Sequence, residues 1–389
     1  MQYNLQNSLL TSLEISKKSG FKKPNSWPNI RKNIHDNCIS LLVDDRYPIG
    51  FAATVTGGYS VDIDGEPYAD YSSGAQFAVA DWADYSATDG YSISYPDGAS
   101  TAHIIDIYPQ TEGENITQFK CQRVAESGTE EQGVLWVHFN LSNAIMLEEM
   151  LYNDVINRLC SAITAKGDKI TLTSIYGWAS GIYSAFTNCY ALEYLPAFVT
   201  INEERTYWQT FKGTAVKTVK LMQGKSNSSS YDLFNGCRQL EQVKGNFVII
   251  PTERTFKDCR SIKKLPAIDA ANSTNMDEFL TNAAALEDTV LDVSAAAGLT
   301  KITCFGTAEY FMGGFKGLRV SNSAPFSGTT PQINVSYTGM DRAALVQLFN
   351  DLPTVTDNQT VNITGCIGTS SLSEDDKAIA TDKGWLITE

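Results

Sequence analysis

Residues 186–195 read FTNCYALEYL, residues 234–243 read FNGCRQLEQV, and residues 256–265 read FKDCRSIKKL. The three segments share the pattern F-x-x-C-x-x-L-x-x-L, with Ile or Val at some leucine positions. Two weaker copies begin at Phe211 and Phe279, so the Phe residues are separated by 25, 23, 22 and 23 positions. A repeat of about 20–29 residues predicts a solenoid, because one short coil cannot bury its apolar face alone.

The period and the residue types indicate leucine-rich repeats, which we expect over residues 181–335. Phe, Cys and Leu or Ile recur because each side chain would lie against its equivalent in the next coil. Cys237 and Cys259 would then lie about 4.8 Å apart, near strand spacing. We expect these cysteines to form a packing column and not a disulfide ladder, within one continuous parallel ladder from about residue 170 to residue 365.

The last part of the chain, residues 336–389, is predicted to be an α/β capping repeat. Residues 340–350 place apolar side chains on one helical face, and Asp341 would complement the N-terminus of that helix. The pattern then predicts a strand, a helix with a serine cap and a final strand, over residues 360–365, 373–380 and 385–388. A solenoid needs such a cap to cover the open face of its last coil.

A β-sandwich is predicted over residues 47–132, where short alternating runs are separated by Gly, Pro, Asp and Ser. Turn signals about every 8–12 residues are typical of that architecture. The acidic pairs Asp62/Asp64 and Asp81/Asp84 are interpreted as turn chemistry, since Asp-Gly favours tight hairpins and further calcium ligands are missing. The predicted strands are residues 50–56, 59–63, 76–80, 91–95 and 101–108.

Two other segments complete the expected domain organisation. Residues 1–46 are interpreted as an N-terminal attachment segment. Residues 133–180 are interpreted as a transition or a first degenerate coil, with an apolar strand at 134–139. The amphipathic stretch 145–156 predicts a helix, although it could instead belong to that degenerate coil.

The composition of the 389 residues excludes several classes of protein. Hydrophobic residues make up 43% and charged residues 19%, which indicates a folded chain. A net charge of −14 makes nucleic acid an unfavourable partner, and no apolar run is long enough for a membrane helix. The first residues lack the order of a secretion signal, so we expect synthesis in a reducing cytoplasm.

The eight cysteines and three histidines do not form a recognisable site. No CxxC pair is present and the histidines are far apart, so neither zinc nor another cofactor is expected. A Cys–His nucleophile pair could form in space, but no spacing selects one. We expect the cysteines to be small buried side chains.

Charge is distributed unevenly along the chain. Residues 47–132 hold fourteen acidic and two basic residues, whereas residues 206–265 hold eleven basic and four acidic ones. Such asymmetry usually follows domain limits and reflects solvated faces, which is the favoured interpretation. The alternative is that the basic stretch binds an anionic surface polymer.

At the family level, the coils resemble surface-antigen leucine-rich repeats, as in AFTNCYALEYLP at 185–196 and TFKDCRSIKKLP at 255–266. The ending from 343 to 385 is similar to the close of repeat proteins encoded by tailed bacteriophages. PNSWP at 24–28 and the stretch 59–74 look like the opening of phage virion proteins that carry an immunoglobulin-like (PKD-type) domain. Those relatives have Trp-Gly-Asp-Gly at the first hairpin, where this chain has Ile63-Asp-Gly-Glu66.

The resemblance implies a non-catalytic structural protein of the virion, a fibre or other appendage. Its N-terminal region would bind other virion proteins, its coils would bind a host-surface glycan or protein, and phage fibres suggest a homotrimer. The candidate contacts are variable positions within the coils, namely Tyr190, Tyr194, Tyr207, Trp208, Arg238, Arg260, Lys263 and Lys264.

Two other functions are weighed against the virion appendage. A bacterial surface adhesin could use the same scaffold, but the missing secretion signal argues against it. A glycan depolymerase would need two carboxylates about 5–9.5 Å apart in a cleft. Glu148/Glu149 and Asp375/Asp376 are adjacent in sequence and lie in stretches predicted as helices, so an enzyme is the least favoured interpretation.

Overall fold

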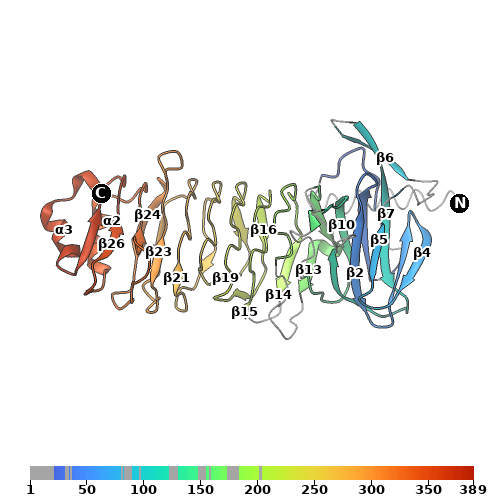
Figure 1. Ribbon diagram of the computed structural model, residues 1–389, viewed down its shortest axis with the longest axis horizontal. Coiled ribbons are helices and arrows are strands. Elements are labelled where there is room, and N and C mark those ends of the chain that lie inside the picture. The colour runs from blue at the N-terminus through green and yellow to red at the C-terminus, as the bar shows by residue number, and fades with distance from the viewer. Residues whose placement is uncertain are drawn as a thin grey trace. The chain divides into compact units, whose positions relative to one another are not determined.

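The computed structural model describes residues 22–30, 35, 37–79, 82, 90–95, 98–121, 130–147, 155–156, 159–172, 184–200 and 204–389. The protein is β-rich with very few helices and contains a β-solenoid of about nine turns (Figure 1). The chain divides into two compact units. The first is Met1–Asn202 with Thr214–Met222, and the second is Glu203–Gly213 with Gln223–Glu389.

The first unit contains two β-sheets that are antiparallel except for one pair of strands. Their strands are β1 (Cys38–Asp44), β2 (Ile49–Val55), β3 (Tyr59–Ile63), β4 (Glu66–Tyr71), β5 (Gln76–Val79), β6 (Tyr91–Tyr95), β7 (Gly98–Pro109), β8 (Ile116–Cys121), β10 (Val134–Asn140) and β12 (Ala162–Ala165). The larger sheet has the order β12-β10-β1-β7-β3-β4, with β6 added to β7, and the smaller has the order β5-β2-β8. Within the described strands of these two sheets, β10 and β12 are the one parallel pair.

Aromatic side chains join the two sheets. Phe51 of β2 stacks on Phe77 of β5 with ring centroids 4.4 Å apart, and lies 6.4 Å from Tyr59 of the larger sheet. Phe119 of β8 lies 6.4 Å from Phe139 of β10. All five side chains are buried. The alternation read from the sequence places strands correctly here, since each of the five predicted strands overlaps an observed one.

The hairpin between β3 and β4 confirms part of the turn interpretation. Asp64 and Gly65 have φ values of 54° and 88°, the left-handed pair that a type I′ turn requires. Asp62 differs, because it lies within β3 and is buried, and its carboxylate accepts a 2.8 Å hydrogen bond from the Tyr108 hydroxyl. Asp81 and Asp84 lie outside the described residues.

The segment after β10 corrects the predicted helix at 145–156. Ile145 forms a parallel bridge with Leu172, and Met146 forms one with Gln118, so these residues are extended. Val155–Ile156 is strand β11, paired in parallel with β9 (Glu130–Glu131). Apolar spacing alone does not separate a short helix from a coil whose inward side chains recur irregularly.

Three further elements follow in the first unit. A short 3₁₀ helix, η2 (Lys166–Asp168), precedes β13 (Lys169–Leu172), which pairs in parallel with β14 (Ala197–Thr200). Strand β16 (Thr218–Lys220) lies near the end of this unit.

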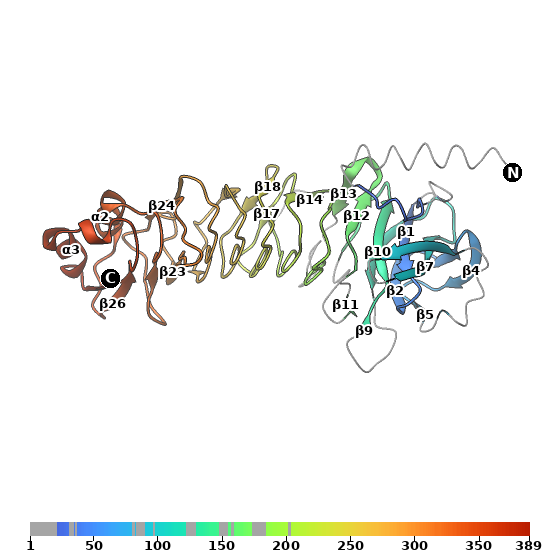
Figure 2. The same ribbon diagram turned by 90° about the horizontal axis from the view of Figure 1, so that it is seen from above.

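Short parallel ladders build the coils of the second unit, which corrects the expected single ladder. One sheet has the order β15 (Glu204–Arg205), β17 (Lys225–Ser226), β19 (Val248–Ile249), β20 (Ala267–Ile268). Another has the order β21 (Asn275–Met276), β23 (Lys301–Thr303), β25 (Ile333–Asn334), β26 (Gln359–Asn362), β27 (Trp385–Thr388). The remaining strands are β18 (Gln242–Lys244) and the pair β22 (Thr289–Asp292) and β24 (Phe315–Arg319). Figure 2 shows β24 on the opposite side of the coils from β23 and β26.

Repeated side chains stack inside these coils. Phe234 lies between Phe211 and Phe256, with ring centroids 5.3 Å apart on both sides. The Cys259 thiol donates to the Phe234 carbonyl of the preceding coil, with Sγ and O 3.1 Å apart. All eight cysteines are buried and free, which confirms packing columns instead of disulfides. The columns hold Phe, Cys, Thr and Ile as well as Leu, so the solenoid is not specifically leucine-rich.

Left-handed backbone conformations explain the small polar residues of the motif. They also correct the predicted alignment of the fifth copy. The residue two positions after the anchoring Phe is left-handed, as at Gly236 and Asp258, and Gly, Asn and Asp tolerate that conformation best. In the fifth copy the left-handed residue is Asn282, two positions after Leu280. The Phe256 amide also donates to the carbonyl of Phe279, the residue before Leu280. Leu280 therefore takes the anchor position that the sequence assigned to Phe279.

The C-terminal cap has the predicted elements. Helix α2 (Arg342–Asp351) begins after Asp341, whose carboxylate accepts a hydrogen bond from the Ala344 amide at 2.9 Å. Helix α3 (Glu374–Thr381) begins after Ser373, which forms a capping box with Asp376. A short 3₁₀ helix, η3 (Thr369–Ser371), lies between them. In the described part of the chain, no helix is long and apolar enough to cross a membrane.

Candidate binding surface

Side chains between the inward columns form the outer surface of the coils. Four of the predicted contact residues are exposed there, namely Tyr190, Arg238, Lys263 and Lys264. Tyr190 is 56% exposed, the second largest value among the large hydrophobic side chains described. Trp208 is half-buried. Tyr194 is also half-buried, and its hydroxyl lies 2.5 Å from Asp168 Oδ1.

Tyr207 is a correction, because its side chain is fully buried and is not part of this surface. Its ring meets Phe247 edge-on, with centroids 4.9 Å apart. Tyr207 lies four positions before its anchoring Phe, and the equivalent residues Ser230 and Thr252 are buried as well. The later coils carry small hydroxyl residues at this position, so no repeated apolar residue in the sequence indicates that the position is buried.

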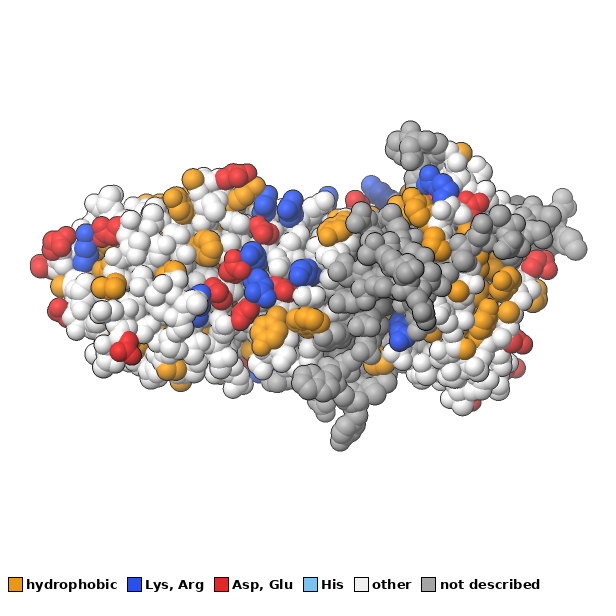
Figure 3. All heavy atoms as spheres, in the orientation of Figure 1, with side chains coloured by type: hydrophobic (Ala, Val, Ile, Leu, Met, Phe, Trp, Pro, Cys, Tyr) orange, Lys and Arg blue, Asp and Glu red, His pale blue; other side chains and the backbone are white. Residues whose placement is uncertain are grey.

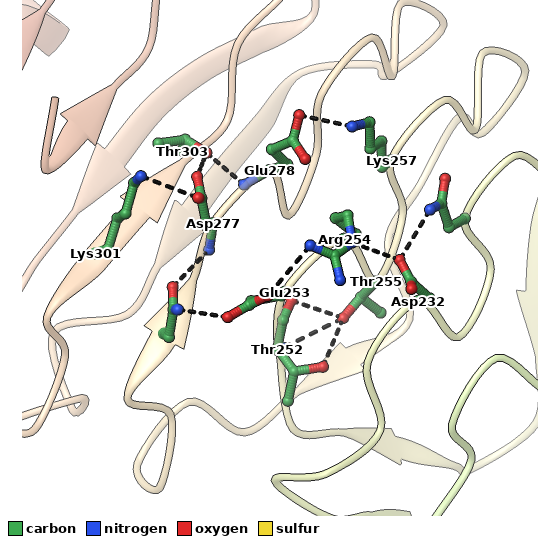
Figure 4. A network of polar contacts seen from close by, with 12 residues as sticks. Asp232, Thr252, Glu253, Arg254, Thr255, Lys257, Asp277, Glu278, Lys301 and Thr303 are labelled. Atoms are coloured by element: carbon green, nitrogen blue, oxygen red, sulfur yellow. Dashed lines mark hydrogen bonds and ion pairs between the residues drawn. The ribbon is translucent and has the colours of Figure 1, made fainter. Parts of the chain in front are cut away.

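Ion pairs neutralise part of the basic stretch 206–265. Arg254 Nε lies 2.7 Å from Asp232 Oδ1, and Lys257 Nζ lies 2.7 Å from Glu278 Oε1. Figure 4 shows these pairs as part of a polar network that runs from coil to coil. Among the described residues, six of the eleven cations in the stretch have an acidic partner within 4 Å, namely Lys212, Lys220, Lys225, Arg254, Lys257 and Arg260.

Asp232 is the most buried carboxylate of this network, with a side chain only 5% exposed. Burial alone would raise its pKa. Hydrogen bonds from Arg254 and Asn235, together with the charges of Lys212 and Arg254, outweigh burial and hold the pKa of Asp232 below its usual range. The carboxylate is therefore charged at neutral pH and fixes the stacking of adjacent coils.

Lys263 and Lys264 also lie beside acidic residues. The Lys263 amide donates to the Glu241 carbonyl, and the Glu287 amide donates to the Lys263 carbonyl, so Lys263 lies between two glutamates of adjacent coils. Figure 3 shows basic and acidic side chains interspersed over the middle coils, without an uninterrupted basic area on that face. This arrangement favours the interpretation of the basic stretch as charge balanced within its own domain.

Tyr310, an aromatic residue outside the repeat pattern, covers one of the predicted contacts. The guanidinium of Arg260 lies 3.8 Å above the ring of Tyr310 and also lies 3.5 Å from Asp258. Tyr310 belongs to a turn closed by a 3.0 Å hydrogen bond from its amide to Thr307 Oγ1. A Cβ at Gly306 would lie 2.5 Å from the Tyr310 carbonyl oxygen, so a glycine is needed there. No repeat pattern covers this turn, so its contact with Arg260 was not predictable from residue spacing.

A groove of about 510 Å³ opens between two neighbouring coils of the second unit. One wall is the segment 264–268, with Lys264 and Pro266, and the other is 287–292, with Glu287 and Asp288. Both walls also contribute apolar side chains. The volume falls within the range of about 300–1,000 Å³ that is usual for ligand pockets.

The thiols are poor candidates for chemistry. Burial raises the pKa of Cys160 to about 12 and raises that of Cys259 well above its usual value. Such thiols stay protonated at neutral pH, whereas nucleophilic attack and metal binding need the thiolate. Within the described residues, no group of three or more His, Cys, Asp or Glu side chains could hold a metal ion.

Of the two carboxylate pairs considered for a depolymerase, the structure describes Asp375 and Asp376. Asp376 accepts hydrogen bonds from Ser373 and Arg342, which assigns it to the α3 cap. Glu148 and Glu149 lie outside the described residues.

Comparison with known proteins gives no relative of this chain. No protein family, no curated protein and no solved structure matches it.

Proposed function

We propose that the chain is a non-catalytic structural component of a tailed-phage virion, an exterior fibre or appendage whose coils bind the host surface. The observation that carries the binding role is the division of each coil into fixed inward columns and variable outer positions. Phe234 and Cys259 are fully buried column residues, whereas Tyr190 and Arg238 are exposed. An extended surface of this kind suits recognition of a polymer or protein. The assignment to a virion rests on the resemblance of the repeats and the C-terminal tail.

The finer fold assignments are part of the same proposal. The two antiparallel sheets joined through Phe51 and Tyr59 support an immunoglobulin-like (PKD-type) domain before the repeats. The 20–29-residue spacing supports a relationship to surface-antigen leucine-rich repeats. The N-terminal region would attach to other virion proteins, and three copies would assemble as in phage fibres.

Purified particles of the encoding phage test this proposal. Peptides of the chain should be present by mass spectrometry, and antibodies against it should label the exterior of the particle in electron micrographs. A cryo-electron microscopy map should show the coils outside the capsid or tail. Particles that contain no copy of the chain would overturn the virion assignment.

The binding role is tested separately with tagged, purified full-length chain and host cells. We expect saturable binding that untagged chain displaces. Cells that adsorb the phage but do not bind the isolated chain, even when it is assembled as on the particle, would contradict a receptor-binding role.

A further inference from the structure

The groove between residues 264–268 and 287–292 lies where the backbone ladder is interrupted. The last hydrogen bond between these segments runs from the Glu287 amide to the Lys263 carbonyl. Among the described residues, no backbone hydrogen bond joins 264–268 to 288–292, and β22 pairs only with β24. Pro266 contributes to this break, because proline has no amide hydrogen to donate. The edge of β22 on this side therefore has no strand partner.

The lining of the groove combines apolar area with polar groups of both kinds. Pro266, Ile268 and Leu291 provide apolar contacts, and Val290 is 59% exposed at the rim. Lys264 provides a donor on one wall, and acidic side chains on the other wall provide acceptors. Neither charge dominates both walls, so the groove offers donors and acceptors across an apolar floor.

We propose that this groove binds a neutral oligosaccharide chain, an assignment that rests on the proposed host-binding function. Sugar hydroxyls both donate and accept hydrogen bonds, so they can be satisfied by a lysine on one side and carboxylates on the other. The C–H faces of a pyranose pack on apolar surface such as that of Pro266 and Ile268. An acidic polysaccharide is disfavoured, because Glu287, Asp288 and Asp292 would repel it.

Binding of defined tetrasaccharides to the full-length chain tests the assignment. One panel contains neutral hexose and N-acetylhexosamine tetrasaccharides, and the other contains hexuronic acid tetrasaccharides. Calorimetry measures affinity, and saturation-transfer NMR identifies bound sugar protons. We expect binding to at least one neutral tetrasaccharide, and none to the uronic acids.

Two groove variants and one control locate the site. Lys264→Ala removes one donor, and Asp288→Asn replaces a charged acceptor with a weaker neutral one; Asn also tolerates the left-handed φ of 38° at position 288. The double variant that carries both changes should bind at least about tenfold more weakly. The control variant Lys244→Ala changes an exposed lysine outside the groove lining and should leave the affinity unchanged. The midpoint of thermal unfolding should be the same for the parent, the double groove variant and the Lys244→Ala control.

The outcomes separate this inference from the proposed function. Binding of uronic acids alone, no binding to either panel, or unchanged affinity in the double groove variant would each overturn the groove assignment. None of these results changes whether the chain is found in purified particles, which tests the virion assignment independently.

Discussion

A charged side chain placed in the cysteine column should unfold the coils around it. Cys259 is fully buried, and its thiol donates to the Phe234 carbonyl at 3.1 Å. The Cys259→Asp variant would place a carboxylate in a fully buried position beside the Cys237 thiol and the Asp258 carboxylate, both of which disfavour a second negative charge.

The magnitude follows from the pKa shift that such burial causes. A fully buried carboxyl shifts upward by about 3–5 units and is therefore largely protonated at pH 7. The lost unfolding free energy at that pH is limited to the cost of protonating the group, roughly 4 kcal/mol, which is close to the lower end of the stability of a small domain, about 5–15 kcal/mol. Cys259→Ala should cost far less, about 1–2 kcal/mol, because the Phe234 carbonyl still accepts from the Cys237 amide at 3.0 Å.

Urea unfolding monitored by intrinsic tryptophan fluorescence measures these differences between pH 3 and pH 8. Because the carboxyl pKa is raised in the folded state, the penalty of Cys259→Asp exists above the ordinary carboxyl pKa of about 4 and disappears below it. The aspartate variant should therefore approach the alanine variant in acid. If the aspartate and alanine variants unfold at the same urea concentration at pH 7, position 259 does not face the interior and the repeat register is wrong.

Three further predictions concern the surface network and the glycines. Asp232→Asn should lower the unfolding free energy by about 1–2 kcal/mol at pH 7. The difference from the parent should vanish as the pH falls through the depressed folded-state pKa of Asp232, because the lost stabilisation requires the carboxylate. Gly314→Ala should destabilise by several kcal/mol in thermal unfolding, since a Cβ there would lie 1.6 Å from the Leu286 carbonyl oxygen, whereas Gly298→Ala, with its closest contact at 3.7 Å, should be nearly neutral. A variant with serine at Arg260, Lys263 and Lys264 should bind host cells with the same salt dependence as the parent, because acidic neighbours already screen these three side chains. If added salt weakens binding of the parent more steeply than binding of the variant, the result would instead support an anionic receptor.

The sequence predicted those elements whose residue types are fixed by backbone geometry. The cap at Ser373, the hairpin at Asp64 and the Phe–Cys columns each depend on a local requirement that few residue types satisfy. The register of the fifth coil was not predictable in the same way. Phe279 and Leu280 are adjacent and both fully buried, so the hydrogen bond from Phe256 and the left-handed backbone at Asn282 decide which one occupies the anchor position.

The candidate surface was less predictable, because exposure depends on neighbouring coils. Tyr207 and Tyr190 are both tyrosines that lie close to a repeat motif in the sequence. Tyr207 is nevertheless fully buried, whereas Tyr190 is 56% exposed. Tyr310 lies 50 residues from Arg260 in sequence and covers it in space. Long-range contacts of this kind have no signature in the spacing of the residues that form them.

Stacking of coils also explains why segment charge was a poor guide to the surface. Parallel stacking brings equivalent positions of adjacent coils to within about 5 Å, so like charges at one position would repel along the whole column. The chain avoids this by alternating Glu241, Lys263 and Glu287 at one position and by pairing Arg254 with Asp232 at another. A run of lysines in sequence can therefore be part of a balanced column in space. The groove beside Lys264 is different, because among the described residues no backbone hydrogen bond joins 264–268 to 288–292 across it. The side chains on its walls therefore face a gap between two coils, and we expect a ligand to bind there and not over the basic stretch as a whole.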